Sequence, residues 1–79
     1  MDDELMQFLD SLDIPKQAAL MYAAKAINAS GLDKHQVYER TQHILRIELG
    51  LNTKPERAQY WRSLSNFEKV LFTQRAVSE

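Results

Sequence analysis

The stretch that decides the fold is residues 14–50, which read IPKQAALMYAAKAINASGLDKHQVYERTQHILRIELG. Six alanines precede Gly31, and an amphipathic run then continues as far as Gly50. Glycine often follows the last turn of a helix, because it adopts the left-handed backbone conformation without strain. The stretch therefore predicts two helices, over 14–30 and 33–49, joined by a short turn.

Local capping signals extend this helical pattern along the chain. Aspartate, serine and threonine side chains satisfy the free N–H groups of a helix's first turn, and a glutamate three residues later completes a capping box. Asp13 and Asp33 are the expected caps of the two helices above. Two more helices, over 54–63 and 65–77, are predicted from the T-x-x-E and S-x-x-E boxes that begin at Thr53 and Ser65.

The N-terminal residues predict a fifth helix, over 3–12. Its apolar residues Leu5, Phe8, Leu9 and Leu12 recur at the spacing of one helix face. No Asn-Gly or Asp-Gly hairpin turn and no alternating run of β-branched residues indicates a strand. We therefore expect an all-α fold, a single small domain over residues 1–79 with about five short helices.

The alanine-rich helix over 14–30 is expected at the centre of this domain. Apolar and small residues lie on nearly every side of it, and such a helix is usually buried on every side. Small side chains also allow a second backbone to approach closely. Two interpretations stay open: the helix is the centre of a monomer, which we favour, or it forms a homodimer through the Ala19/Ala23/Ala26 face.

Composition excludes several classes of protein. The chain has 79 residues, no cysteine and a net charge of −1, which excludes a disulfide framework and a cysteine zinc site. The longest uncharged run, residues 17–24, is far shorter than the about 20 residues that span a bilayer. We therefore expect a cytoplasmic protein without a membrane partner.

The sequence gives little indication of a catalytic site or a metal site. The chain has 2 histidines and none of the common nucleophile, zinc or phosphate-binding motifs. His35, Glu39 and His43 follow one helix face over two turns, and three ligands at that spacing do not converge on one ion without a bend. We expect no enzyme, no metal site and no cofactor.

Charge is the most informative feature of the sequence. Residues 1–13 contain Asp and Glu but no Lys or Arg, whereas residues 14–79 contain all 10 of the chain's Lys and Arg residues. An acidic amphipathic helix, or the basic surface that it leaves free, is typical of a protein-binding surface. Docking of the acidic helix onto its own domain explains the same pattern.

The sequence thus predicts a small non-enzymatic regulatory or adaptor protein that acts through protein–protein contacts of its helix faces. Aromatic and arginine side chains dominate interface hot spots, and the last two predicted helices offer both. Half-buried packing between helices explains the same rings equally well. The expected partner-binding residues are Trp61, Arg62, Lys69, Phe72, Arg75, Leu5, Phe8 and Leu9.

The turn at Gly31 resembles the centre of a helix-turn-helix motif. Val37 falls where that motif needs a buried aliphatic residue, whereas Ile27 and Arg40 depart from its pattern. The resemblance implies an alternative function, a dimeric DNA-binding regulator using residues 14–49. Its DNA-binding residues would be Lys34, His35, Gln36 and Arg40. The net charge of −1 makes nucleic acid the less favoured partner, because basic charge carries much of the affinity for DNA.

Overall fold

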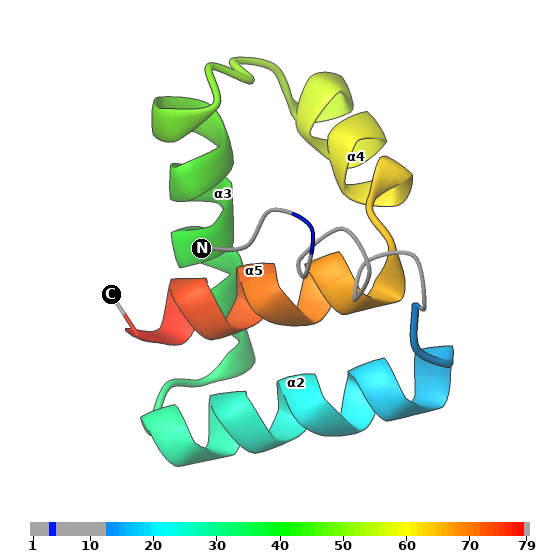
Figure 1. Cartoon of the computed structure of the whole chain (residues 1–79). Coiled ribbons are helices and arrows are strands. Elements are labelled where there is room, and N and C mark those ends of the chain that lie inside the picture. The colour runs from blue at the N-terminus through cyan, green and yellow to red at the C-terminus, as the bar shows by residue number, and fades with distance from the viewer. Residues whose placement is uncertain (1–3, 5–12, 79) are drawn as a thin grey trace.

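The computed structural model describes Glu4 and residues 13–78. The predicted helix over 3–12, with Leu5, Phe8 and Leu9, lies outside these described residues apart from Glu4. The described part contains no strand, and the all-α prediction is confirmed. Its helices are α2 (Lys16–Ser30), α3 (Lys34–His43), the π-helical segment η1 (Ile44–Glu48), α4 (Lys54–Ser63) and α5 (Asn66–Ser78), arranged as in Figure 1.

Capping boxes fix the starts of α3, α4 and α5. In each box the side-chain oxygen of the cap residue accepts the N–H three residues later, and the side chain of that later residue accepts the cap's own N–H. The two predicted boxes, at Thr53 and Ser65, are confirmed, and a third forms around Asp33. Gly31 and Gly50 have φ values of 76° and 69°, the left-handed conformation expected where a helix ends.

Asp13 does not cap α2, which corrects our prediction from the sequence. Pro15 occupies the cap position of α2 and makes no side-chain capping bond. The Asp13 carboxylate instead accepts the N–H of Phe67, in the first turn of α5, at 3.0 Å, and the N–H of Ile14 at 2.8 Å. These two hydrogen bonds hold the pKa of Asp13 below its ordinary value. Asp13 therefore ties the start of α2 to the start of α5.

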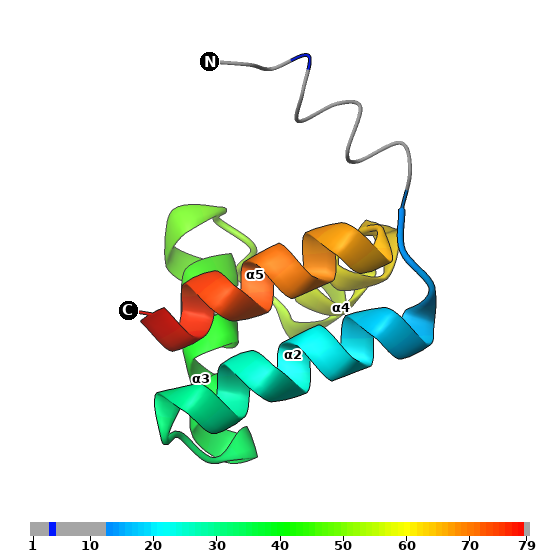
Figure 2. The same cartoon turned by 60° about the horizontal axis from the view of Figure 1, so that its bottom comes forward.

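α5 occupies the central position that we expected for the alanine-rich α2. It packs against both α2 and α3 and buries Val70, Thr73 and Ala76. In Figures 1 and 2, α2 lies along one side of α5, at the edge of the molecule. The small side chains of α2 allow α5 to approach on one side, while larger side chains of α2 remain exposed, since Met21 and Tyr22 are 54% and 47% exposed.

The face predicted for a homodimer takes part in packing within the chain. Ala19 is buried, and Ala23 and Ala26 are half-buried. Ala19 and Ala23 line a hollow together with residues of α5 such as Val70. A homodimer through the Ala19/Ala23/Ala26 face stays a prediction, and it would compete with this packing.

The end of the third predicted helix is π-helical. Because a π-helix has more residues per turn than an α-helix, consecutive side chains point in more similar directions. Ile44 and Leu45 are accordingly both buried, at 1% exposure each, while Ile47 and Leu49 are 61% and 43% exposed.

No helix in the described ranges is both long enough and apolar enough to cross a membrane.

Candidate partner-binding groove

An apolar hollow of about 490 Å³ is lined by Thr73 of α5, by Leu45 of η1 and by residues of the three helices α2, α3 and α4. These helices are at the bottom, left and upper right of Figure 1. Val37, Leu45 and Thr73 are its buried floor, and Ile27 and Trp61 are half-buried lining residues. The elements that line it come together only through the tertiary fold.

A second hollow, of about 320 Å³, continues the first one between α2 and α5. The two hollows share Ala23, Trp61 and Thr73 in their walls. We call the two hollows together the basic groove. Its outer end lies beside Lys16 and Asn66, close to the point where the Asn66 side chain donates a hydrogen bond to the carbonyl of Ile14 at 3.0 Å.

Every charged residue that lines the basic groove, within the described ranges, is basic. These residues are six of the chain's 10 Lys and Arg residues, namely Lys34, Lys54, Arg57 and Arg62 in the larger hollow and Lys16 and Lys69 in the smaller. The two ion pairs found among the described residues, His35–Glu39 and Arg75–Glu48, use none of them. Clustered charge of one sign on apolar walls creates a field that attracts the opposite sign.

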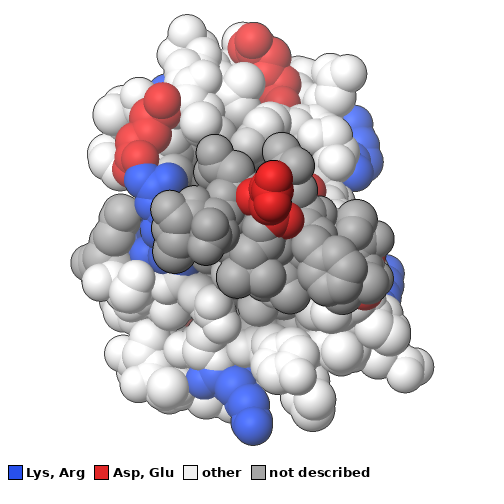
Figure 3. All heavy atoms as spheres, viewed as in Figure 1, with Lys and Arg blue, Asp and Glu red and all other residues white. Residues whose placement is uncertain are grey.

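The charges outside the groove are mixed in sign. On the face seen in Figure 1, the acidic and basic side chains of the described residues are interspersed, as Figure 3 shows. The Arg75–Glu48 pair joins α5 to η1, and both side chains are partly exposed. Outside the groove, residues 14–78 carry four Lys or Arg and five Asp or Glu, so the excess positive charge of this part of the chain lies at the basic groove.

α4 forms one wall of the groove with few buried contacts of its own. None of its residues is buried. Arg57 attaches it to the rest of the chain by donating to the side-chain oxygen of Gln42 at 2.5 Å and to the carbonyl of Leu51 at 2.9 Å. The second attachment is an edge-to-face contact between the rings of Trp61 and Phe72, whose centroids are 5.8 Å apart.

The structure separates the partner-binding residues predicted from the sequence. Trp61, Arg62 and Lys69 line the basic groove. Phe72 and Arg75 line a different hollow, of about 230 Å³, together with Tyr60. Leu5, Phe8 and Leu9 lie outside the described residues. The Trp61 and Phe72 rings are both half-buried and form a packing contact between α4 and α5.

The residues of the DNA-binding alternative make different contacts in the structure. Lys34 lines the basic groove, and the Gln36 side chain completes the capping box of α3. His35 lies 3.6 Å from the carboxylate of Glu39. The guanidinium of Arg40 is half-buried and donates to the carbonyl of Ala76 at 3.5 Å, near the end of α5. Val37 is buried, which is what the helix-turn-helix spacing requires.

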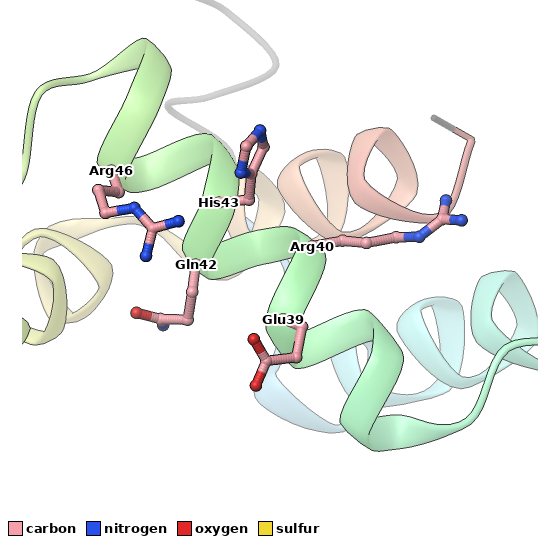
Figure 4. Close-up of a pocket in the computed structure, with 5 residues that line it drawn as sticks. All are labelled: Glu39, Arg40, Gln42, His43 and Arg46. Atoms are coloured by element: carbon pink, nitrogen blue, oxygen red, sulfur yellow. The ribbon is translucent and has the colours of Figure 1, made fainter.

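Another hollow, of about 430 Å³, lies on the outer side of α3. The side chains that line it do not point toward a common centre. In Figure 4 the five side chains that line it fan out from the helix in different directions, with Arg40 pointing along α5 and His43 pointing the opposite way from Glu39. No three metal-ligating side chains within the described ranges come together around one point. This side of α3 therefore provides polar surface and no assembled site.

Several residues of the groove were not anticipated from the sequence. Lys54, Arg57, Ala58 and the buried pair Val37 and Leu45 line it without having been selected as binding residues. The sequence feature that could have indicated them was the excess of basic residues in the last two helices.

No protein-family model, curated protein or solved structure matches this chain. The functional proposal therefore rests on the groove.

Proposed function

We propose that the protein is a small, non-enzymatic regulatory or adaptor protein that binds a partner protein in the basic groove. The observation that carries this proposal is an apolar floor surrounded by basic side chains in one hollow. Protein-binding sites combine apolar anchor pockets with charged borders, and tryptophan and arginine are the residue types most enriched where binding energy concentrates. Trp61 and Arg62 are neighbours in the groove wall.

The attachment of α4 also supports a binding role. A wall without buried residues belongs to the less stable part of a fold, because few apolar contacts are lost when it moves. Arg57 and the Trp61–Phe72 ring contact hold α4 in place, and its groove-lining residue Ala58 is exposed. A partner that enters the groove would add the buried contacts that α4 lacks.

A matched pair of variants tests this proposal. Ala58 and Gln59 are adjacent, exposed residues of α4, and of the two only Ala58 lines the groove. Ala58→Trp fills the groove with a large ring, whereas Gln59→Trp adds the same ring outside it. Tagged full-length chains are expressed in cells of the source organism, and the proteins that co-purify are quantified by mass spectrometry.

We expect a protein that co-purifies with the wild type and with Gln59→Trp but is lost from Ala58→Trp, while circular dichroism shows the same helicity in all three. The same set of proteins with all three chains would contradict the proposal. A cytoplasmic location stays a prediction, for which the cysteine-free sequence is the support.

Duplex DNA stays the alternative partner, and the buried Val37 is the observation in its favour. It predicts binding that weakens steeply with salt and that is lost in a Lys34→Ala/Arg40→Ala variant. Absence of binding to a mixed-sequence duplex in about 50 mM salt would exclude it, because non-specific affinity is strongest at low salt.

A further inference from the structure

We infer that the segment bound in the basic groove is an acidic amphipathic α-helix of another protein. This inference rests on the proposed function and specifies the chemistry of the partner. Its basis is the juxtaposition of two features: a floor made of Val37, Leu45 and Thr73, and a border to which every described charged residue contributes positive charge.

The walls of the groove favour a helix over an extended peptide. An extended segment needs a neighbouring strand to satisfy its backbone N–H and C=O groups when it is buried. The described ranges contain helices and no strand, so the groove has no free strand edge. A helix satisfies these groups internally and presents a stripe of apolar side chains, which is the usual way in which helices occupy apolar grooves.

The two hollows fit such a stripe. They follow each other along α2, because the larger one is lined by Ala23 and Ile27 and the smaller one by Lys16, Ala19 and Ala23. Anchors at positions i, i+4 and i+7 of a bound helix lie on one face, one turn apart. One or two anchors enter the larger hollow beside Trp61, and the next enters the smaller one.

The positive charge of the groove favours a partner segment of negative charge. Lys34, Lys54 and Arg62 are exposed at the larger hollow, and Lys16 is exposed at the smaller one. Acidic side chains flanking the apolar stripe would face these cations on both sides of the groove. The charges of a basic helix with the same stripe would be repelled by these side chains, since no described acidic residue lines the groove.

The floor distinguishes this partner from nucleic acid. A nucleic acid also carries negative charge, but its phosphates need basic and polar contacts, and its bases need flat aromatic surfaces or hydrogen-bonding groups. Val37, Leu45 and Ile27 offer aliphatic surface, and Trp61 is the one aromatic ring in the larger hollow besides the exposed Tyr38. An amphipathic helix buries that surface, whereas a phosphate backbone does not.

The chain carries its own reporter for a binding test. The sequence contains a single tryptophan, Trp61, which lines both hollows. Its fluorescence therefore reports occupancy of the groove. The probes are synthetic helical peptides without tryptophan or tyrosine. The first is an acidic peptide with leucines at i, i+4 and i+7 and with alanines and a few glutamates elsewhere. The second is a basic peptide with lysines in place of the glutamates, and the third is the acidic peptide with its leucines replaced by glutamine. The full-length chain is titrated with each.

We expect saturable binding of the acidic peptide and binding about tenfold weaker, or absent, for the basic peptide and for the peptide without leucines. Binding of the acidic peptide weakens when the salt is raised from about 50 mM to about 500 mM, because ions screen the charges at the groove border. Equal binding of the acidic and basic peptides would overturn the inference.

Paired charge reversals locate the effect. Lys34→Glu/Arg62→Glu reverses two exposed groove charges, and Lys25→Glu/Arg46→Glu makes the same change of net charge at exposed positions outside the groove. We expect about a tenfold loss of acidic-peptide affinity in the first variant and little change in the second. The same loss in both would mean that net charge alone attracts the peptide, which contradicts the inference.

Two further outcomes identify a different occupant and overturn the inference. In the first, analytical ultracentrifugation shows a dimer of the wild-type chain, and Lys34→Glu/Arg62→Glu dissociates it. The occupant of the groove would then be a second copy of this chain, whose residues 1–13 carry only acidic charge. A labelled oligonucleotide that binds more tightly than the acidic peptide would favour nucleic acid. If the peptides fail while Ala58→Trp still loses its cellular partner, the acidic-helix inference fails and the proposed function stands.

Discussion

Leu45→Ala, compared with Leu49→Ala, tests whether η1 closes the core beneath the groove. Both leucines lie at the end of the third predicted helix, but Leu45 is 1% exposed and Leu49 is 43% exposed. Leu45 also lines the floor of the groove. The two substitutions remove the same atoms from buried and half-exposed sites, so their difference measures burial at this turn.

The expected loss follows from the burial of each side chain. Replacing a fully buried leucine by alanine removes its transfer free energy and leaves a cavity, which costs about 2–5 kcal/mol. For Leu45 we expect a loss near the middle of this range, about 3 kcal/mol. Leu49 already contacts water over much of its surface, so its loss is about 1 kcal/mol. A domain of this size has a free energy of unfolding of about 4–12 kcal/mol, so both variants are expected to remain folded at 25 °C.

Thermal and urea unfolding, followed by circular dichroism at 222 nm, measure these losses. For a domain of this length, each 1 kcal/mol lowers the midpoint temperature by about 4–8 °C. We expect Leu45→Ala to lower it by about 12–24 °C and Leu49→Ala by about 4–8 °C, with unchanged urea m-values. A fall for Leu45→Ala no larger than that for Leu49→Ala would refute the assignment of Leu45 to a closed core.

Three other predictions follow from the helix ends. Thr53→Ala removes the capping box of α4 and is expected to cost about 1 kcal/mol in urea unfolding, whereas the exposed neighbour Asn52→Ala should cost almost nothing. Asp13→Asn is expected to lower stability at pH 7. The wild type should approach the variant as the pH falls below 3.8, because the backbone N–H groups of Phe67 and Ile14 lower the pKa of Asp13 by stabilising its ionised form more than its protonated form; parallel pH profiles would contradict this. Gly31→Ala is expected to cost about 1–2 kcal/mol from left-handed strain alone, since an added Cβ at this φ of 76° meets nothing within 4 Å. Gly31→Asn should cost less, and equal losses would argue against strain.

The helices of the described part were largely predictable because their signals are local. The predicted range 54–63 coincides with α4, and 65–77 differs from α5 by one residue at each end. Each boundary depends on a cap and a residue three positions away, which the sequence shows directly. The π-helical end of 33–49 was not predictable in this way, because it lets both Ile44 and Leu45 face a core that other segments provide.

The groove was less predictable because it depends on tertiary contacts. Trp61, Arg62 and Lys69 were selected from their residue types and do line it. Lys34 and Val37 were interpreted only as parts of a DNA-binding motif, because nothing in the sequence places them opposite α4. The position of α5 at the centre has the same origin: the apolar character of α2 is visible in the sequence, but the fact that only one of its faces meets α5 is not.

The most direct test of the binding groove is nuclear magnetic resonance mapping on the full-length chain. The 15N-labelled protein is titrated with the acidic amphipathic peptide, and amide and indole shifts are followed. The account predicts the largest shifts at Val37, Leu45, Ala58 and the Trp61 indole, which line the groove. Shifts concentrated instead at Met21 and Tyr22, exposed residues of α2 that line neither hollow, with the groove signals unchanged, would contradict it.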